Sequence, residues 1–255
     1  MALVFFAGTA YAYAEEPVMI TLSVKMINVV FDGKWSYMEE WKESTLNSLT
    51  YDDGSEIELR TAHNGNFIYV MIDDVTGTNY QKGSDYAMIC FDTSKVRPEK
   101  PNSNDYCFAN SLGRSEPMTL QGGSPMALGG NFKRVANPIG LVGVSAVSDV
   151  NDRYSTDPHS SYEFRIPLDQ LGRLDHYGFY MQVYDAGDNK FYTYPRNVPV
   201  ASVFDIPAPK LWGGMISPDE SLPEFPLPAF LLVSAFSFLI LIYIRASPLF
   251  SFKTR

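Results

Sequence analysis

The sequence has few of the residues on which catalytic centres usually depend. Its 255 residues include two cysteines and three histidines, and they contain no Gly-x-Ser-x-Gly, His-Glu-x-x-His or Cys-x-x-Cys motif. Hydrolase, zinc-protease and thiol-redox chemistry therefore lack a recognisable nucleophile or ligand set. Two pairs of nearby acids, Glu39 with Glu40 and Asp149 with Asp152, are expected to be solvated surface groups. We expect a protein that is not an enzyme.

Positive charge is also scarce. Lys and Arg total 20 against 29 Asp and Glu, which gives a formal net charge of −9. A protein that binds a nucleic-acid backbone needs a basic patch, and no run of basic residues supplies one. Nucleic acid is therefore excluded as a partner, whereas acidity is compatible with a solvated exterior, a saline habitat or divalent-ion binding.

Long apolar runs are absent between the two ends of the sequence. Residues 1–14 read as a signal peptide cut after Ala14, although the usual basic n-region is missing and a buried first strand is the alternative. Residues 227–244 pass without a charge and are long enough to form a transmembrane helix. Basic residues in the tail, 245–255, place that tail in the cytoplasm and the domain outside.

The segment before this apolar run is a Pro-rich linker, residues 213–226, and it ends in a short motif. Pro223-Glu224-Phe225-Pro226 precedes the hydrophobic stretch, and a few basic residues follow it. This arrangement resembles the PEF-CTERM sorting signals of archaeal surface proteins, which implies an archaeosortase as a possible partner. Simple retention as a membrane helix is the alternative, and both place the protein at the cell surface.

The region between these ends, residues 15–212, shows no long stretch of helical periodicity. It contains repeated short apolar or alternating segments separated by Gly, Pro, Asn and Asp, which predicts an all-β fold, a two-sheet antiparallel sandwich. The predicted strands are 21–30, 57–63, 66–74, 86–91, 105–109, 141–147, 161–166, 178–184 and 191–194.

One of these pairs of strands allows a register to be predicted. Asn64-Gly65 favours a type I′ turn because both residues tolerate a positive φ. A two-residue loop at this position predicts that Leu59 lies opposite Val70 and that Ile57 lies opposite Ile72. One side of the hairpin is then apolar and the other mixed.

Four pieces of the sequence, taken together, resemble carbohydrate-binding module family nine and its DOMON-like relatives. They are Asp32-Gly33 followed by Trp35 and Trp41, and the runs 64–70 (NGNFIYV), 162–168 (YEFRIPL) and 178–185 (GFYMQVYD). The resemblance implies an immunoglobulin-like or jelly-roll-like β-sandwich, often outside the cell. It also implies sugar binding or, in some branches, a b-type haem, although fold transfers between relatives better than function does.

The strand 178–184 offers candidate sugar-binding groups. If its odd-numbered residues face the core, Tyr180, Gln182 and Tyr184 share the other face, and Tyr192 on the next strand extends it. Aromatic faces and amides are what a sugar site requires. Coverage of these tyrosines by loops is the alternative, and Trp35 and Trp41 are expected to anchor the N-terminal segment.

Other ligands and roles remain open at this stage. Haem would require an axial Met with His or Lys, and His63, His159 and His176 fall in no motif that assigns one. Calcium is possible at the acidic turns 52–54 and 185–189, which lack the EF-hand spacing. A structural subunit of a surface layer or membrane complex, without a small ligand, is a further possibility.

Cys90 and Cys107 both lie in predicted strands joined by a Pro- and Asn-rich loop. In an oxidising exterior they are suited to form a disulfide, which would contribute about 3 kcal/mol in the chain-entropy model. Two buried thiols are the alternative.

Overall fold

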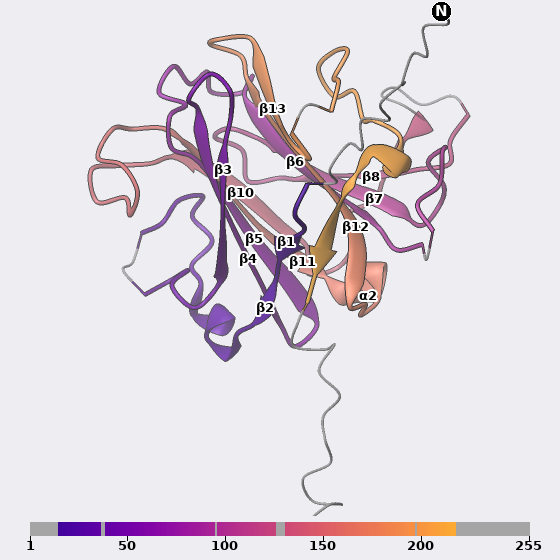
Figure 1. Ribbon diagram of the computed structural model, residues 1–255. Helices are drawn as coiled ribbons and strands as arrows, with labels where there is room; N and C mark the ends of the chain where they lie inside the picture. Colours follow the sequence, from indigo (N-terminus) through magenta and orange to yellow (C-terminus); the bar gives the residue numbers. More distant parts are fainter. Residues whose placement is uncertain (1–14, 37–38, 95, 126–130, 197, 218–255) are drawn as a thin grey trace, which may run out of the picture. The chain divides into compact units, whose positions relative to one another are not determined.

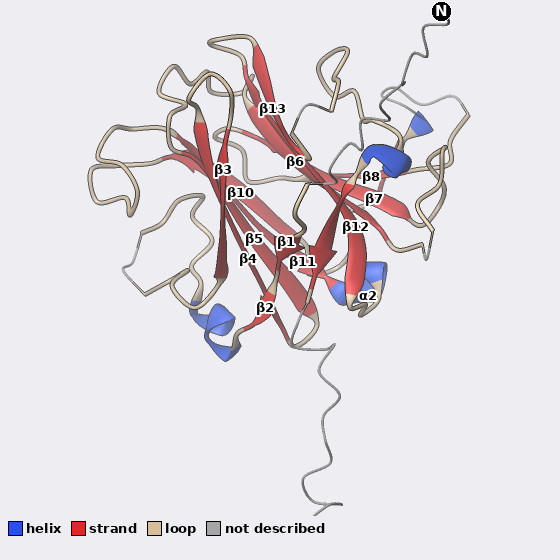
Figure 2. Cartoon of the chain, in the orientation of Figure 1, coloured by secondary structure: helices blue, strands red, loops and turns tan. Residues whose placement is uncertain are grey.

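The computed structural model describes residues 15–36, 39–94, 96–125, 131–196 and 198–217. These residues form two β-sheets packed face to face, which confirms the all-β prediction (Figure 1). The helical segments of this region are short, as Figure 2 shows in blue. They include η1 (Val24–Asn28), α2 (Leu168–Leu171) and η2 (Pro209–Leu211).

The larger sheet has eight strands. Seven follow one another as hydrogen-bonded neighbours, and β13 (Lys190–Tyr194) pairs with β12 off that path. In spatial order the seven are β1 (Val18–Met19), β14 (Gly213–Ile216), β12 (His176–Asp185), β6 (Tyr86–Asp92), β7 (Asp105–Ser111), β8 (Met118–Gln121) and β9 (Lys133–Val135).

The smaller sheet has six strands, five of them in one path, while β3 (Thr45–Thr50) pairs with β4. The path is β10 (Val142–Val147), β11 (Ser160–Pro167), β5 (Phe67–Asp74), β4 (Glu56–Asn64) and β2 (Thr21–Leu22). Most pairings in both sheets are antiparallel, but β1 runs parallel to β14 and β2 runs parallel to β4.

The inner faces of the two sheets enclose the main hydrophobic core. Alternate residues of β12 (Phe179, Met181 and Val183) meet Ile68, Val70 and Ile72 of β5 in this core. The period of two along a strand places every second side chain on the same face, so the predicted orientation of β12 is confirmed.

The predicted hairpin is present, but its predicted register is wrong. Leu59 lies opposite Ile72, and the two loop residues are Gly65 and Asn66 rather than Asn64 and Gly65. Gly65 has φ +55°, and Asn66 does not share a positive φ, so glycine occupies the first central position, as in a type II′ turn. The shift is two residues, which leaves each side chain on its predicted face.

The predicted first strand, 21–30, is also wrong in extent. Backbone pairing stops at Leu22, and η1 replaces the rest of the run. The N-terminal segment instead crosses between the sheets, because β1 pairs in the larger sheet and β2 in the smaller. The amide of Ile20, between them, donates to the carbonyl oxygen of Ile216.

The end of the domain lies beyond residue 212. Residues 213–216, expected in the linker, form β14 and pair with β12. Residues 218–226 of the linker, the expected membrane helix 227–244, the tail and the signal segment lie outside the described residues. Within the described part of the chain, no helix is long and apolar enough to cross a membrane.

Candidate functional site

The outer face of the larger sheet carries a second apolar cluster. Tyr180 and Gln182 of β12 lie in or beside it, as predicted, and neither has exposed surface. The segment that follows β13 covers them, with Trp212 stacked 6.1 Å from the Tyr180 ring. Tyr180 and Gln182 are therefore internal groups that support the surface above them.

Tyr192 lies on the inner face of the larger sheet, opposite to the face that carries Tyr180 and Gln182. The β12–β13 pairing sets Tyr184 opposite Phe191 and Val183 opposite Tyr192, so Tyr192 shares the inner face with Val183. Its hydroxyl lies 2.9 Å from Ser55 Oγ. The structure thus brings three of the four expected residues to one face and puts Phe191 where the sequence suggested Tyr192.

Three half-buried aromatic rings, Phe191, Tyr184 and Phe204, reach the surface at this end of the sheet. We call them the aromatic row. The Tyr184 and Phe191 rings stack at 4.7 Å with an interplanar angle of 27°, and Phe204 stacks at 4.3 Å on the buried ring of Tyr86. Tyr86 also lies 5.6 Å from Tyr184 and thereby links the three rings.

Buried hydrogen bonds fix the base of the aromatic row. Gln182 accepts from the Tyr180 hydroxyl at 3.0 Å and donates to the Tyr86 hydroxyl at 2.6 Å. The Tyr86 hydroxyl also accepts from the backbone amide of Phe204, which has φ +59°. Burial raises the pKa of both tyrosines, so these hydroxyls stay neutral and act only through hydrogen bonds.

Polar groups border the exposed rings. The Tyr184 hydroxyl donates to Asn189 Oδ1 at 3.0 Å, and Asp188, Asn189 and Lys190 are exposed in the turn between β12 and β13. An amide, a carboxylate and an ammonium group therefore stand next to apolar ring faces, which is the mixture that ligands with both apolar faces and hydroxyl groups require.

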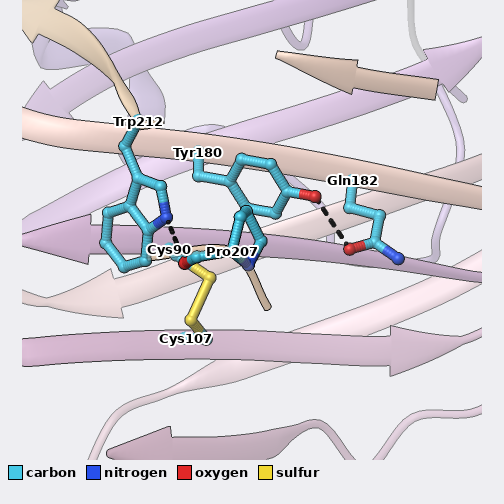
Figure 3. The surroundings of a disulfide bond; sticks show 6 residues. All are labelled: Cys90, Cys107, Tyr180, Gln182, Pro207 and Trp212. Atoms are coloured by element: carbon cyan, nitrogen blue, oxygen red, sulfur yellow. Dashed lines mark hydrogen bonds between the residues drawn. A yellow bond between two sulfur atoms is a disulfide. The ribbon is translucent and has the colours of Figure 1, made fainter. Parts of the chain in front are cut away.

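Cys90 and Cys107 form a disulfide beneath this cluster (Figure 3). The two residues are directly opposite across the β6–β7 pairing, with a Cα–Cα distance of 4.0 Å. Trp212 belongs to the same cluster and donates from Nε1 to the carbonyl oxygen of Pro207 at 3.0 Å. The Trp212 indole thus packs the covering segment against β6 and β7, the two strands that the disulfide links.

The outer face of the smaller sheet is covered by residues that the sequence places before the hairpin. Trp35 and Trp41 are buried there with Tyr69 and Met71, which matches the anchoring role expected for the two tryptophans. Glu163 of β11 accepts from Gly33 N at 2.7 Å and from Trp41 Nε1 at 2.8 Å. Burial raises the pKa of Glu163 to about 8, and these donors oppose that rise.

The acid pairs and acidic turns are largely committed to partners within the chain. Glu40 is buried and accepts from Val30 N, so it is not the solvated group that the sequence suggested. Asp53 forms a 2.7 Å ion pair with Lys190, which holds its pKa below the usual range. Asp185 accepts from the backbone amide of Asp188.

The three histidines lie at separate places in the described chain. His63 Nε2 lies 3.0 Å from Ser217 Oγ, and His159 Nε2 lies 2.8 Å from Asp73 Oδ1. His176 is exposed and lines a cleft of about 1290 Å³ beside β3 and β14, whose lining contains no methionine.

The cleft offers a second concave surface. Glu16, Asp52, Arg97 and Arg196 contribute charges of both signs to its wall. Of the aromatic residues that line it, Tyr177, Tyr194 and Trp212 are almost fully buried, and Tyr51 is half-buried. The cleft therefore has one half-buried ring, against three in the aromatic row.

No family model matches the sequence, and no curated protein is similar to it. Among solved structures, the chain is similar to a carbohydrate binding module family 9 (CBM9) from Caldicellulosiruptor kristjanssonii. The structure in complex with cellotriose has a TM-score of 0.47 and 14% identity, and the structure in complex with glucose has a TM-score of 0.49 and 15% identity. Each match covers 83% of this chain and 100% of the other.

Proposed function

We propose that this protein is a non-catalytic carbohydrate-binding module and that the aromatic row is its contact surface. The observation that carries the proposal is the stacked, half-exposed pair of Tyr184 and Phe191, extended by Phe204 over Tyr86. Such rings match the apolar faces of pyranose sugars, and the adjacent amide of Asn189 and carboxylate of Asp188 match their hydroxyl groups.

The rigidity of the row supports this role. A ring that is already held in place loses little conformational entropy on binding, so more of its contact energy contributes to affinity. The disulfide, the Gln182 bridge and the stacking on Tyr86 all restrict the rings before a ligand arrives.

The binding test compares three single variants on a panel of soluble and surface glycans, with glucose and cellotriose among the probes. Tyr184→Ala and Phe191→Ala are expected to weaken binding at least tenfold, which corresponds to about 1.4 kcal/mol each. Phe31→Ala is the control, because Phe31 is also half-buried but stacks with Tyr69 on the other sheet.

The measurement is calorimetric titration with the glycan that binds best, after circular dichroism has shown that each variant is folded. Equal affinity in wild type, Tyr184→Ala and Phe191→Ala would show that the row is not the site. Absence of binding to every glycan on the panel would contradict the proposed function itself.

We also propose that the domain acts outside the cytoplasm, at a cell surface to which the C-terminal segment anchors it. The Cys90–Cys107 disulfide supports this location, because disulfides persist in oxidising compartments. Protease accessibility of the domain in intact cells tests the location outside the cytoplasm. The same measurement after deletion of residues 223–255 tests the C-terminal anchoring.

A further inference from the structure

A second cluster of chemistry-bearing groups lies on the outer face of the smaller sheet, whereas the aromatic row belongs to the larger sheet. Asp73 is at the end of β5, and Asp152 and His159 belong to the connection between β10 and β11. One ligand atom from each of the three lies within 4.8 Å of the others. All three side chains are at most 1% exposed.

The histidine ring is oriented as a metal ligand usually is. Its Nδ1 lies 2.7 Å from the carbonyl oxygen of Asp157 and 2.9 Å from Ser148 Oγ. The carbonyl oxygen can only accept, so Nδ1 carries a proton. Nε2 then points at the two carboxylates, 2.8 Å from Asp73 Oδ1 and 3.8 Å from Asp152 Oδ1. A backbone carbonyl on the distal nitrogen is the outer-shell contact that fixes a metal-binding imidazole.

Two carboxylate oxygens of this cluster are unpartnered. Oδ2 of Asp73 and Oδ2 of Asp152 are buried and accept no hydrogen bond from the described residues. The buried hydroxyl of Ser161 lies directly opposite Asp73 across the β5–β11 pairing and can donate to its carboxylate. Buried polar atoms are nearly always paired, so two unpartnered carboxylate oxygens beside one imidazole indicate a missing ligand.

The charge of the cluster indicates the kind of ligand. In the described chain, the ion pairs of both carboxylates involve only His159. A protonated imidazole would leave one negative charge buried, whereas a divalent cation with neutral His159 would balance both carboxylates. Burial of an unbalanced charge is costly, so the divalent cation is the better complement.

We propose that Asp73, Asp152 and His159 bind a divalent transition-metal ion such as Zn²⁺ or Mn²⁺. The nitrogen ligand favours these ions over Ca²⁺ and Mg²⁺, which prefer sites made only of oxygen. The ion clamps the 148–159 connection to β5 and β11. This connection carries Tyr154, whose ring packs edge-on against Trp35 at 5.9 Å. Metal binding therefore stabilises the cover of this sheet.

The test begins with the full chain, stripped of metal with a chelator and then equilibrated separately with Zn²⁺, Mn²⁺, Co²⁺, Ca²⁺ or Mg²⁺. We expect one transition-metal ion per chain by elemental analysis and a Tm higher by about 5 °C or more at saturation. With Co²⁺ we expect visible absorption bands from nitrogen and oxygen ligation. Ca²⁺ and Mg²⁺ should not be taken up and should not change the Tm.

Two variants assign the site. His159→Gln and Asp152→Asn should lose metal uptake, whereas His63→Gln should keep it, because His63 is a buried histidine outside the cluster. Wild type that takes up no ion and shows no change in Tm would overturn the proposal, leaving an ion pair between His159 and Asp73. Full uptake by His159→Gln, or equal uptake of Ca²⁺, would also overturn it. If a variant does not fold, the wild-type metal content and cobalt spectrum decide.

Discussion

The two sheets of this protein are covered in different ways. On the smaller sheet, the N-terminal segment is held by ionisable groups: Glu163 and Glu40 accept from its backbone, and Arg60 donates to the carbonyl oxygen of Trp41 at 3.1 Å. On the larger sheet, the cover is held by aromatic packing over the disulfide-linked strands β6 and β7, with Gln182 as its polar bridge.

This difference has a functional consequence. The smaller sheet also carries half-buried rings, Phe31, Phe67 and Tyr154, but guanidinium groups lie over them. Arg165 lies 4.8 Å from the centre of the Phe67 ring and 5.5 Å from that of Phe31, and Arg60 lies 5.8 Å from that of Tyr154. Aromatic packing on the larger sheet ends in a row of half-exposed rings. The first cover is therefore suited to stability and the second to contact with a ligand.

The largest effect is expected from breaking the polar cover at Glu163. Glu163→Ala removes the acceptor of three donors, the backbone amides of Asp32 and Gly33 and the indole of Trp41. Leaving several buried donors unpaired is expected to cost about 3–5 kcal/mol of the free energy of unfolding. Urea denaturation measures it.

Glu163→Gln serves as the control for volume, since it keeps one acceptor and nearly the same shape. It should cost less than Glu163→Ala. A loss below about 1 kcal/mol in the alanine variant would mean that the N-terminal segment is held mainly by its tryptophans.

The corresponding change on the aromatic side is loss of the disulfide. Cys90→Ala combined with Cys107→Ala opens a cross-link between residues 17 apart in sequence, and the expected cost is about 3 kcal/mol in the chain-entropy model. Denaturation of the double variant measures this cost, and reduced wild type provides an independent comparison. Equal stability of oxidised and reduced wild type would show that packing alone holds this face.

The two covers also differ in how far the sequence allowed them to be predicted. Alternation along β12 identified the outward-facing residues correctly, and the tryptophans were expected to be anchors. The family resemblance rested partly on Asp32-Gly33 and on Glu163, and the structure joins these directly. An added Cβ on Gly33 would lie 2.4 Å from the backbone of Ser145, so this glycine is required by close packing.

The remaining features depended on geometry that the sequence does not encode locally. In the β12–β13 hairpin, Asp185 pairs with Lys190, and this turn length decides that Phe191 rather than Tyr192 lies beside Tyr184. Phe204 joins the aromatic row from a segment outside the strands. Asp73 and His159 are 86 residues apart, and only the pairing of β5 with β11 brings them together.

A pH-dependent loss of stability is expected from buried acids where the two sheets meet. Burial, with Asp185 and Asp85 nearby, raises the pKa of Asp74 from 3.8 to about 7. The folded state then keeps a proton that the unfolded state releases, so stability falls as the pH rises from about 4 to about 7.

Asp74→Asn should remove this contribution. The variant should be more stable than wild type at pH 8 by a few kcal/mol, with little difference at pH 3.5, because each unit of pKa shift corresponds to about 1.4 kcal/mol. Urea denaturation across this pH range measures both curves. Parallel curves would show that Asp74 is not the group that titrates.

The smallest effect on stability is expected at the aromatic row itself. Tyr184 is half-buried, and its hydroxyl bonds to Asn189, which is exposed, so Tyr184→Ala should lower the free energy of unfolding by about 1 kcal/mol. Urea denaturation measures the change. A loss as large as that of Glu163→Ala would mean that this ring holds the fold rather than presents a contact surface. A small loss combined with weaker glycan binding would separate ligand contact on the larger sheet from structural support on the smaller one.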